Sequence, residues 1–173
     1  MNARRLDLAS LALALGTIAS PAAAIDLPTT GAVGVPANRI VGTWANQALV
    51  GPCGGTPLEV QRQTLKFGAG GMFLDNARFP PAGVSNLHGV SGLHHRSIGV
   101  GDWTYSPATG QYTLDQRFDW YVNNAYHGYQ VVRRTILLSA DGSTASGPVR
   151  TVRYTAAGAS VFEACGNAVS TRL

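Results

Sequence analysis

From residue 39 onward the sequence alternates between strand-like runs and short turn signals, and this spacing constrains the fold more than any other feature. The runs are rich in β-branched and aromatic residues, and glycine, proline, asparagine or aspartate separates most of them. The dipeptide Asp141–Gly142 is a particularly clear hairpin signal. Helical periodicity is scarce, so the sequence predicts an all-β protein. The predicted strands cover residues 39–49, 60–67, 72–78, 99–106, 111–122, 129–139, 144–155 and 160–173.

Alternation within the runs predicts which side chains point inward, because successive residues of a strand face opposite sides of the sheet. The inner face of run 111–122 carries four apolar residues and one glutamine: Tyr112, Leu114, Gln116, Phe118 and Trp120. In run 129–139 both faces contain apolar residues and an arginine, and we favour the face with Val132, Arg134, Ile136 and Leu138 as the inner one. By the same reasoning Gln63 shares a face with Leu65 and Phe67, and Asp75 shares one with Phe73.

Consecutive antiparallel strands joined by short hairpins favour a closed barrel, because closure removes the exposed edges that an open sheet would leave. We therefore predict one domain, residues 39–173, that forms an eight-stranded up-and-down β-barrel. Its interior is either filled by side chains or holds one small ligand. A two-sheet sandwich is the alternative, but it normally needs longer crossover connections than these hairpins provide.

The N-terminal residues resemble an export signal. Arg4 and Arg5 precede an apolar stretch and an A-x-A pattern that ends at Ala24, so we expect residues 1–24 to be a cleaved signal peptide. Residues 25–38, with two prolines and two glycines, read as an extended leader. We expect a periplasmic or extracellular protein that is not inserted in the membrane after the signal is removed, because no later segment is long and apolar enough.

The distribution of charged residues bears on nucleic-acid binding, and the two cysteines bear on disulfide formation. After loss of Arg4, Arg5 and Asp7, the 11 basic residues (13 − 2) and 8 acidic residues (9 − 1) give a formal charge of +3. The basic residues are scattered rather than clustered with aromatic ones, so we expect no nucleic-acid partner. Cys53 and Cys165 do not have the spacing of metal ligands, and in an exported protein we expect them to form a disulfide, with two free thiols as the alternative.

The barrel resembles the lipocalins and the wider calycin group. A G-x-W sequence, Gly42 to Trp44, lies on the first predicted strand, and Arg172 lies at the end of the last one. The resemblance implies that the indole closes one end of the barrel and that the guanidinium packs over it. A disulfide between the first and last parts of the barrel fits this group. The chain has no predicted helix after the last strand, so it is similar to short bacterial forms, and the allene oxide cyclase group is a second possible relative.

Three of the four histidines lie between the third and fourth predicted strands, in residues 79–97. His94 and His95 are adjacent, so their side chains diverge in extended backbone, and no other cluster supplies the remaining ligands of a zinc site. We therefore interpret His88, His94 and His95 as part of a flexible loop at the mouth of the barrel, with no metal and no cofactor. Long loops of this kind often take part in binding.

We expect the barrel to bind a small apolar or amphipathic molecule, because aromatic walls with a few polar groups are typical of such a pocket. The predicted ligand-binding residues are Phe73, Asp75, Trp103, Phe118, Trp120 and Arg134. Asp75 and Arg134 would pair inside the barrel, hold a polar head group or take part in acid–base chemistry. Two alternatives are an isomerase or cyclase of the allene oxide cyclase type, and an interaction module with a filled barrel. No serine lies in a nucleophile motif.

Overall fold

The computed structural model describes residues 36–57 and 59–173. A 3-10 helix, η1 (Pro36–Ile40), replaces the last part of the predicted leader and precedes the sheet. The strands are β1 (Gly42–Gly51), β2 (Glu59–Phe67), β3 (Met72–Ala77), β4 (Val84–Leu87), β5 (Val90–Arg96), β6 (Gly99–Ser106), β7 (Gln111–Val122), β8 (Ala125–Leu138), β9 (Thr144–Thr155) and β10 (Ser160–Arg172). All eight predicted strands are present, whereas β4 and β5 lie in the segment that was predicted to be a loop.

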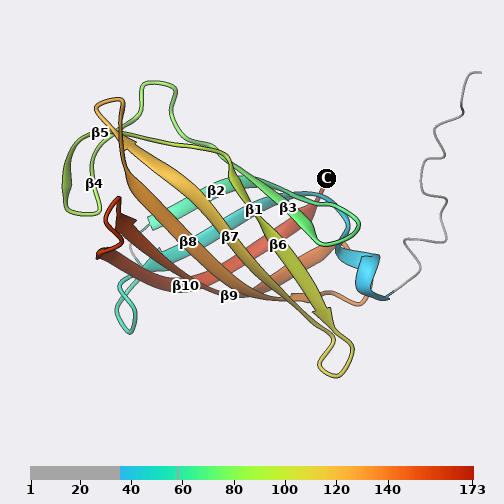
Figure 1. Cartoon of the computed structure of the whole chain (residues 1–173). Helices are drawn as coiled ribbons and strands as arrows, with labels where there is room; N and C mark the ends of the chain where they lie inside the picture. The colour runs from blue at the N-terminus through green and yellow to red at the C-terminus, as the bar shows by residue number, and fades with distance from the viewer. Residues whose placement is uncertain (1–35, 58) are drawn as a thin grey trace, which may run out of the picture.

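The sheet closes into an eight-stranded antiparallel barrel, which confirms the predicted fold (Figure 1). Neighbours along the sheet are β7, β6, β3, β2, β1, β10, β9 and β8, and a pairing between β7 and β8 closes the ring. The first strand of the chain pairs with the last one, from Trp44 opposite Arg172 to Gly51 opposite Cys165. No α-helix occurs within the described ranges.

The β4–β5 hairpin corrects the prediction of a flexible loop over residues 79–97. β6 pairs with β7 up to Val100, which lies opposite Arg117. β5 pairs with the remaining part of β7, starting at Arg96 opposite Trp120. β4 pairs with β5 in turn. The 12-residue β7 extends beyond its 8-residue partner β6, and β5 satisfies the backbone groups that would otherwise be left unpaired. The hairpin lies at the end of the barrel opposite η1 (Figure 1).

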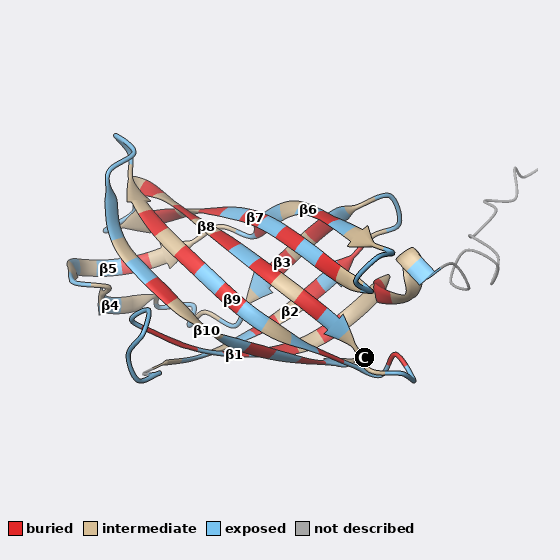
Figure 2. Ribbon diagram, turned by 90° about the horizontal axis from the view of Figure 1, so that it is seen from below, coloured by how far each residue is buried: buried red, intermediate tan, exposed pale blue. Residues whose placement is uncertain are grey.

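Burial alternates along the strands as the sequence predicted (Figure 2). The inner face of β7 is buried from Tyr112 to Trp120. On β8, Val132, Arg134 and Ile136 are buried, which confirms the orientation we favoured for this strand. The four polar side chains predicted to point inward are all buried: Gln63, Asp75, Gln116 and Arg134.

The apolar core is split into two clusters by these buried polar side chains. The cluster next to η1 contains large side chains that fill this half of the barrel, namely Ile40, Trp44, Leu65, Phe67, Phe73, Trp103, Tyr112, Leu114, Ile136 and Ala145. The cluster toward the hairpin contains Ala48, Val50, Phe118, Trp120, Val132, Val149, Ala164 and Ala168. Three of its eight members are alanine, whereas the cluster next to η1 consists mostly of large side chains.

The η1 end is closed by Trp44 and Arg172. The Arg172 guanidinium lies 4.3 Å from the centre of the Trp44 ring, while the indole Nε1 donates a hydrogen bond to Ile40 at 2.9 Å. Arg172 also donates to the carbonyls of Val41, Gly142 and Arg39. Gly42 has φ of 140°, and a Cβ there would lie 2.7 Å from Arg172 Nη1, so only glycine suits this position.

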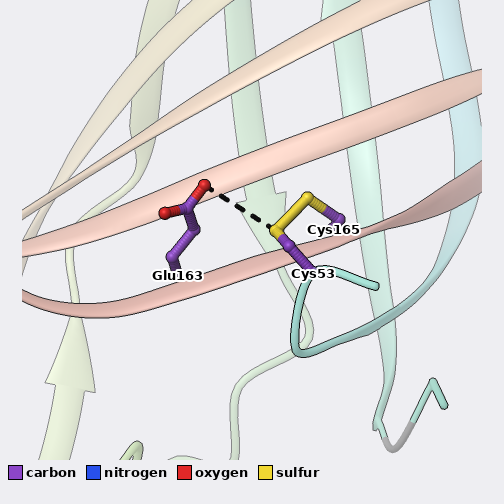
Figure 3. A group of neighbouring side chains, drawn as sticks. All are labelled: Cys53, Glu163 and Cys165. Atoms are coloured by element: carbon purple, nitrogen blue, oxygen red, sulfur yellow. Dashed lines mark hydrogen bonds between the residues drawn. A yellow bond between two sulfur atoms is a disulfide. The ribbon is translucent and has the colours of Figure 1, made fainter. Parts of the chain in front are cut away.

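Cys53 and Cys165 form the predicted disulfide, which links the connection between β1 and β2 to β10 (Figure 3). The two residues are 112 positions apart in the sequence. The predicted signal peptide and residues 25–35 of the leader lie outside the described residues. No helix in the described ranges is long and apolar enough to cross a membrane.

Candidate functional site

A cavity of about 150 Å³ lies at the hairpin end of the barrel. Its walls come from the start of β2, the end of β3, the β4–β5 hairpin and the inner faces of β7 and β8. The lining residues are Glu59, Val60, Gln61, Arg62, Ala77, Arg78, Phe79, Pro80, Val84, Leu87, His88, Arg96, Phe118, Trp120 and Gln130. The barrel is therefore packed at one end and hollow at the other.

The structure divides the six predicted ligand-binding residues into three pairs. Phe118 and Trp120 line the cavity. Phe73 and Trp103 belong instead to the packed cluster next to η1. The third pair, Asp75 and Arg134, is buried between the two clusters and does not line the cavity.

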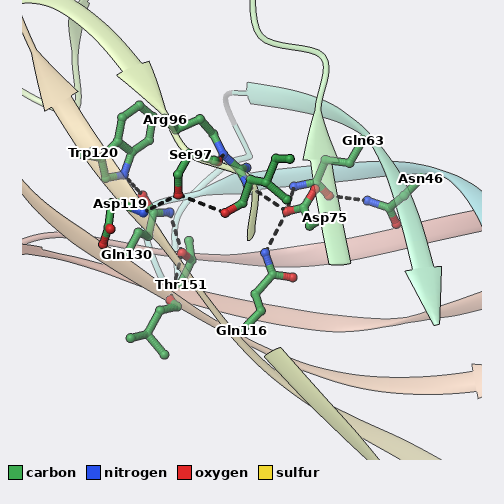
Figure 4. Close-up of polar contacts among 12 residues, drawn as sticks. Asn46, Gln63, Asp75, Arg96, Ser97, Gln116, Asp119, Trp120, Gln130 and Thr151 are labelled. Carbon is green, nitrogen blue, oxygen red and sulfur yellow. Dashed lines mark hydrogen bonds and ion pairs between the residues drawn. The ribbon is translucent and has the colours of Figure 1, made fainter. Parts of the chain in front are cut away.

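Asp75 is the centre of a hydrogen-bonded layer that crosses the barrel (Figure 4). Its Oδ2 accepts hydrogen bonds from Gln116 Nε2 at 2.7 Å, Arg96 Nη2 at 3.1 Å and Gln63 Nε2 at 3.3 Å. The layer continues on the other side, where Asn46 Nδ2 donates to Gln63 Oε1 at 2.7 Å. A buried carboxylate is stable only when it is paired in this way, so Asp75 has a structural role.

Arg96 connects this layer to the cavity. Its guanidinium lies 3.6 Å above the Phe118 ring, and the side chain is 5% exposed. Nε donates to the Ser97 carbonyl at 3.1 Å, and Nη2 donates to Asp75. The glycine at position 99 makes room for the group, because a Cβ there would lie 3.1 Å from both Arg96 Nη2 and the Asp75 Cβ. Burial lowers the pKa of Arg96, and the negative charge of Asp75 opposes this effect.

The ion pair proposed between Asp75 and Arg134 is not direct. Arg134 Nη2 donates to Gln63 Oε1 at 2.7 Å, and Gln63 in turn contacts Asp75. The salt bridge of Asp75 is formed with Arg96, which the sequence placed in a loop. Burial lowers the pKa of Arg134, with partial compensation by Asp75. Within the described ranges, Arg134 Nε, Asp75 Oδ1 and Gln116 Oε1 are buried without a hydrogen-bond partner.

Trp120 is held in position by a second set of hydrogen bonds (Figure 4). Its Nε1 donates to Gln130 Oε1 at 2.7 Å, and Gln130 Nε2 donates to Thr151 Oγ1 at 2.5 Å. The Phe79 ring packs against its edge, with ring centres 5.8 Å apart. These contacts fix one aromatic wall of the cavity.

Arg153 and His94 form a buried pair next to Trp120. Both are fully buried, and the Arg153 guanidinium lies 4.6 Å from the centre of the Trp120 ring. Arg153 Nη2 donates to His94 Nδ1 at 3.3 Å, and His94 Nε2 donates to the Val90 carbonyl at 2.9 Å. An arginine can only donate, so this geometry requires a neutral His94 with its proton on Nε2. Burial lowers the pKa of His94 and lowers that of Arg153 to about 10.

His88, at the turn of the hairpin, covers the mouth of the barrel. Its ring stacks on Phe162 of β10 with centres 3.9 Å apart, and Nε2 lies 3.8 Å from Glu59 Oε2 at the start of β2. The His88 ring also packs edge-on against the Trp120 ring, with ring centres 5.9 Å apart. Interaction with His88 lowers the pKa of Glu59. The hairpin thus contacts three separate strands of the barrel.

The histidines do not come together as a metal site in the described ranges. His94 points inward to Arg153, whereas the His95 ring lies 6.5 Å from that of Phe79. The one group with metal-ligand geometry in the same ranges consists of Cys53, Cys165 and Glu163 (Figure 3). The two sulfurs are oxidised in the disulfide, so they are not thiolate ligands, and Glu163 accepts a 2.6 Å hydrogen bond from Arg150.

The sequence placed His88 at the mouth of the barrel, but it did not predict the inward positions of Arg96 and Arg153 or the stacking of His88 on Phe162. One available signal was the length of run 111–122, which is longer than its predicted partner 99–106. The excess implied that another segment pairs with the end of this strand. Arg153 shares its strand parity with Thr151 and Val149, which are also buried. Alternation would therefore have placed it inside the barrel.

Comparison of the chain with family models, with curated proteins and with solved structures gives no match. The closed antiparallel barrel without α-helices in the described ranges fits a lipocalin-like barrel, and membership of that group stays a prediction.

Proposed function

We propose that this protein is exported and binds a small, partly apolar molecule without forming a covalent bond, in the cavity under the β4–β5 hairpin. The observation that carries the proposal is the cavity itself, about 150 Å³ in a barrel whose other half is packed. Apolar walls with a few positioned polar groups are typical of small-molecule sites.

The chemistry of the lining supports this proposal. Phe118 and Trp120 provide flat aromatic surfaces, and Gln130 and Thr151 hold the indole of Trp120 in a fixed orientation. A site whose walls are fixed before binding loses less entropy when the ligand enters. Arg96 adds a cationic group on the same cavity.

Export is supported by the disulfide. A bond between Cys53 and Cys165 is consistent with an oxidising compartment, and the basic, apolar and A-x-A pattern of residues 1–24 resembles a signal peptide. We propose a periplasmic or extracellular location.

Two other functions have less support. In an isomerase or cyclase, Asp75 and Arg134 would act on a bound substrate, but neither residue lines the cavity. An interaction module with a filled barrel would not need a cavity. We therefore favour non-covalent binding.

The proposal is tested by filling the cavity. Ala77 lines it, and its pairing with Gln63 places both side chains on the inner face, so Ala77→Leu adds volume inside. We expect the unmodified protein to bind at least one single-ring aromatic compound, neutral or charged, with saturable heat in titration calorimetry. Ala77→Leu should abolish this binding.

Ala108→Leu is the matched control, because Ala108 is exposed in the turn between β6 and β7. It should bind like the unmodified protein, and circular dichroism will show that both variants are folded. Absence of binding to every compound, or equal binding by Ala77→Leu, would refute the proposed function.

A further inference from the structure

The cavity has the size of a single aromatic ring. A protein cavity of about 150 Å³ with apolar walls accommodates benzene, and the cavity at the hairpin end has about this volume. Phe79, Phe118 and Trp120 surround it, and such faces favour offset or edge contacts with another ring. A long acyl chain would extend out of the cavity through its mouth, where it would lose contact with these walls.

One polar group of the cavity is suited to an anion. Arg96 uses Nε and Nη2 in hydrogen bonds to Ser97 and Asp75, and the described residues offer no partner to its Nη1. The guanidinium lies against Phe118, so the cation and the aromatic wall belong to one surface. Guanidinium groups form their strongest hydrogen bonds with carboxylates and phosphates.

The interior of the described barrel holds more positive than negative charge. Arg96, Arg134 and Arg153 point inward, and Asp75 is the buried carboxylate, which pairs with Arg96 and partly compensates Arg134. His94 does not compensate for Arg153, because it accepts a hydrogen bond as a neutral ring. Buried charges are costly unless they are paired, so a bound anion would offset part of this excess.

Glu59 determines how a negatively charged ligand is oriented in the cavity. Its side chain, 42% exposed, lies at the mouth of the cavity near His88, whereas Arg96 is buried at the inner end. A negative head group is repelled by Glu59, and the buried Arg96 attracts it more strongly than the exposed, solvent-screened Arg78 at the rim. The acidic end of a ligand therefore points inward.

We propose that the ligand is a small aromatic carboxylate, with one ring between Phe118, Trp120 and Phe79 and its carboxylate on Arg96. This inference rests on the proposed function, and it specifies the class of molecule. The small volume selects one ring, the aromatic walls select its flat shape, and the excess positive charge selects the carboxylate.

The test compares ligands of equal shape on the unmodified protein. Benzoate and phenylacetate should bind at least about tenfold more tightly than benzamide and benzyl alcohol at pH 7 in titration calorimetry, because a charged hydrogen bond is lost in the neutral compounds. This comparison needs no mutation, so it does not depend on the folding of a variant.

Substitutions of Arg96 provide the second arm. Arg96→Met should remove the preference for benzoate over benzamide, whereas Arg96→Lys, which keeps the charge, should retain part of it. Arg133→Met is the control, since Arg133 is exposed on the outer face of β8, does not line the cavity, and its loss should leave the preference intact.

The outcomes separate this inference from the proposed function. If benzamide binds as tightly as benzoate, the carboxylate inference is wrong while ligand binding in the cavity stands. If dodecanoate binds more tightly than benzoate, the limit to one ring is wrong. If none of the compounds binds, the proposed function fails and the inference fails with it.

Discussion

The two ends of the barrel differ in how they are filled. At the η1 end, large apolar side chains from many strands pack together, and Trp44 has its indole N–H and its ring face both occupied. At the hairpin end the wall contains alanines, the side chains are held by polar contacts, and a cavity remains. Several strands run through both ends, but η1 closes one end and the β4–β5 hairpin covers the other, so the difference comes from these elements as well as from the residues of the wall.

This difference predicts that the η1 end contributes most to stability, whereas the hairpin end is the place where a ligand would bind. Close packing of apolar side chains provides most of the free energy of folding, and a cavity reduces it. The buried layer around Asp75 lies between the two ends and is hydrogen-bonded on both sides of the barrel. We therefore expect a ligand to bind at the hairpin end without disturbing the packed end.

The largest expected effect is on stability at the η1 end. Phe73 is fully buried, 4.9 Å from Phe67 between ring centres, and Phe73→Ala should lower the free energy of unfolding by about 3–5 kcal/mol. Chemical denaturation measures this loss. Calorimetry should show that the variant still binds the ligand with unchanged affinity.

Phe118→Ala provides the contrast, because Phe118 lines the cavity and supports Arg96. We expect it to weaken ligand binding strongly. If Phe73→Ala weakened binding as much as Phe118→Ala, the two ends would not be independent.

The sequence predicted the eight strands of the barrel and the inward direction of Gln63, Asp75, Gln116 and Arg134 because alternation is a local property of each strand. It did not predict β4 and β5. Gly83 and Gly89 lie on either side of β4 and Gly92 lies within β5, and all three have positive φ, which interrupts the alternation. The pairing of β5 with β7 depends on residues far apart in the chain.

The candidate site was predicted less completely for the same reason. Phe118 and Trp120 lie on a strongly alternating strand and were found, whereas Arg96 lies at the end of β5 and reaches Asp75 across 21 residues. The filling of the η1 end by Phe73 and Trp103 depends on side chains from many strands, so alternation alone showed that these two residues point inward and not which half is hollow.

A smaller effect tests whether the hairpin is packed onto the barrel. His94 forms two hydrogen bonds and is buried, so His94→Ala combined with His95→Ala should lower the free energy of unfolding by about 1–3 kcal/mol. The loss leaves the Val90 carbonyl and Arg153 Nη2 unpaired. His95→Ala alone should change stability by less than about 0.5 kcal/mol, because His95 is partly exposed. Equal stabilities of the single and double variants would mean that the hairpin is only loosely attached.

The smallest expected effect is a pH dependence confined to the hairpin end. The folded protein holds the pKa of His94 below its ordinary value of 6.5, mainly through burial, with further lowering by Arg153, His88 and His127. As the pH falls below about 6.5, the unfolded chain binds a proton at this histidine and the folded chain does not. The free energy of unfolding therefore falls with the pH, by at most about 1.4 kcal/mol per unit for one proton, until the folded pKa is reached.

His94→Gln isolates this contribution, since a glutamine amide has both an acceptor for Arg153 and a donor for the Val90 carbonyl, and it does not titrate. The other groups that face position 94 are the same in both proteins, so their titration cancels in the difference between the two pH profiles. We expect the profiles to run parallel above pH 7 and to diverge below pH 6.5, with the stability of the unmodified protein falling more steeply. Parallel profiles throughout would mean that His94 takes up a proton as readily in the folded protein as in the unfolded chain, so that burial does not lower its pKa. A proton on Nδ1 would then face the N–H of Arg153 Nη2. The hydrogen bond from Arg153 to a neutral His94 would therefore be wrong.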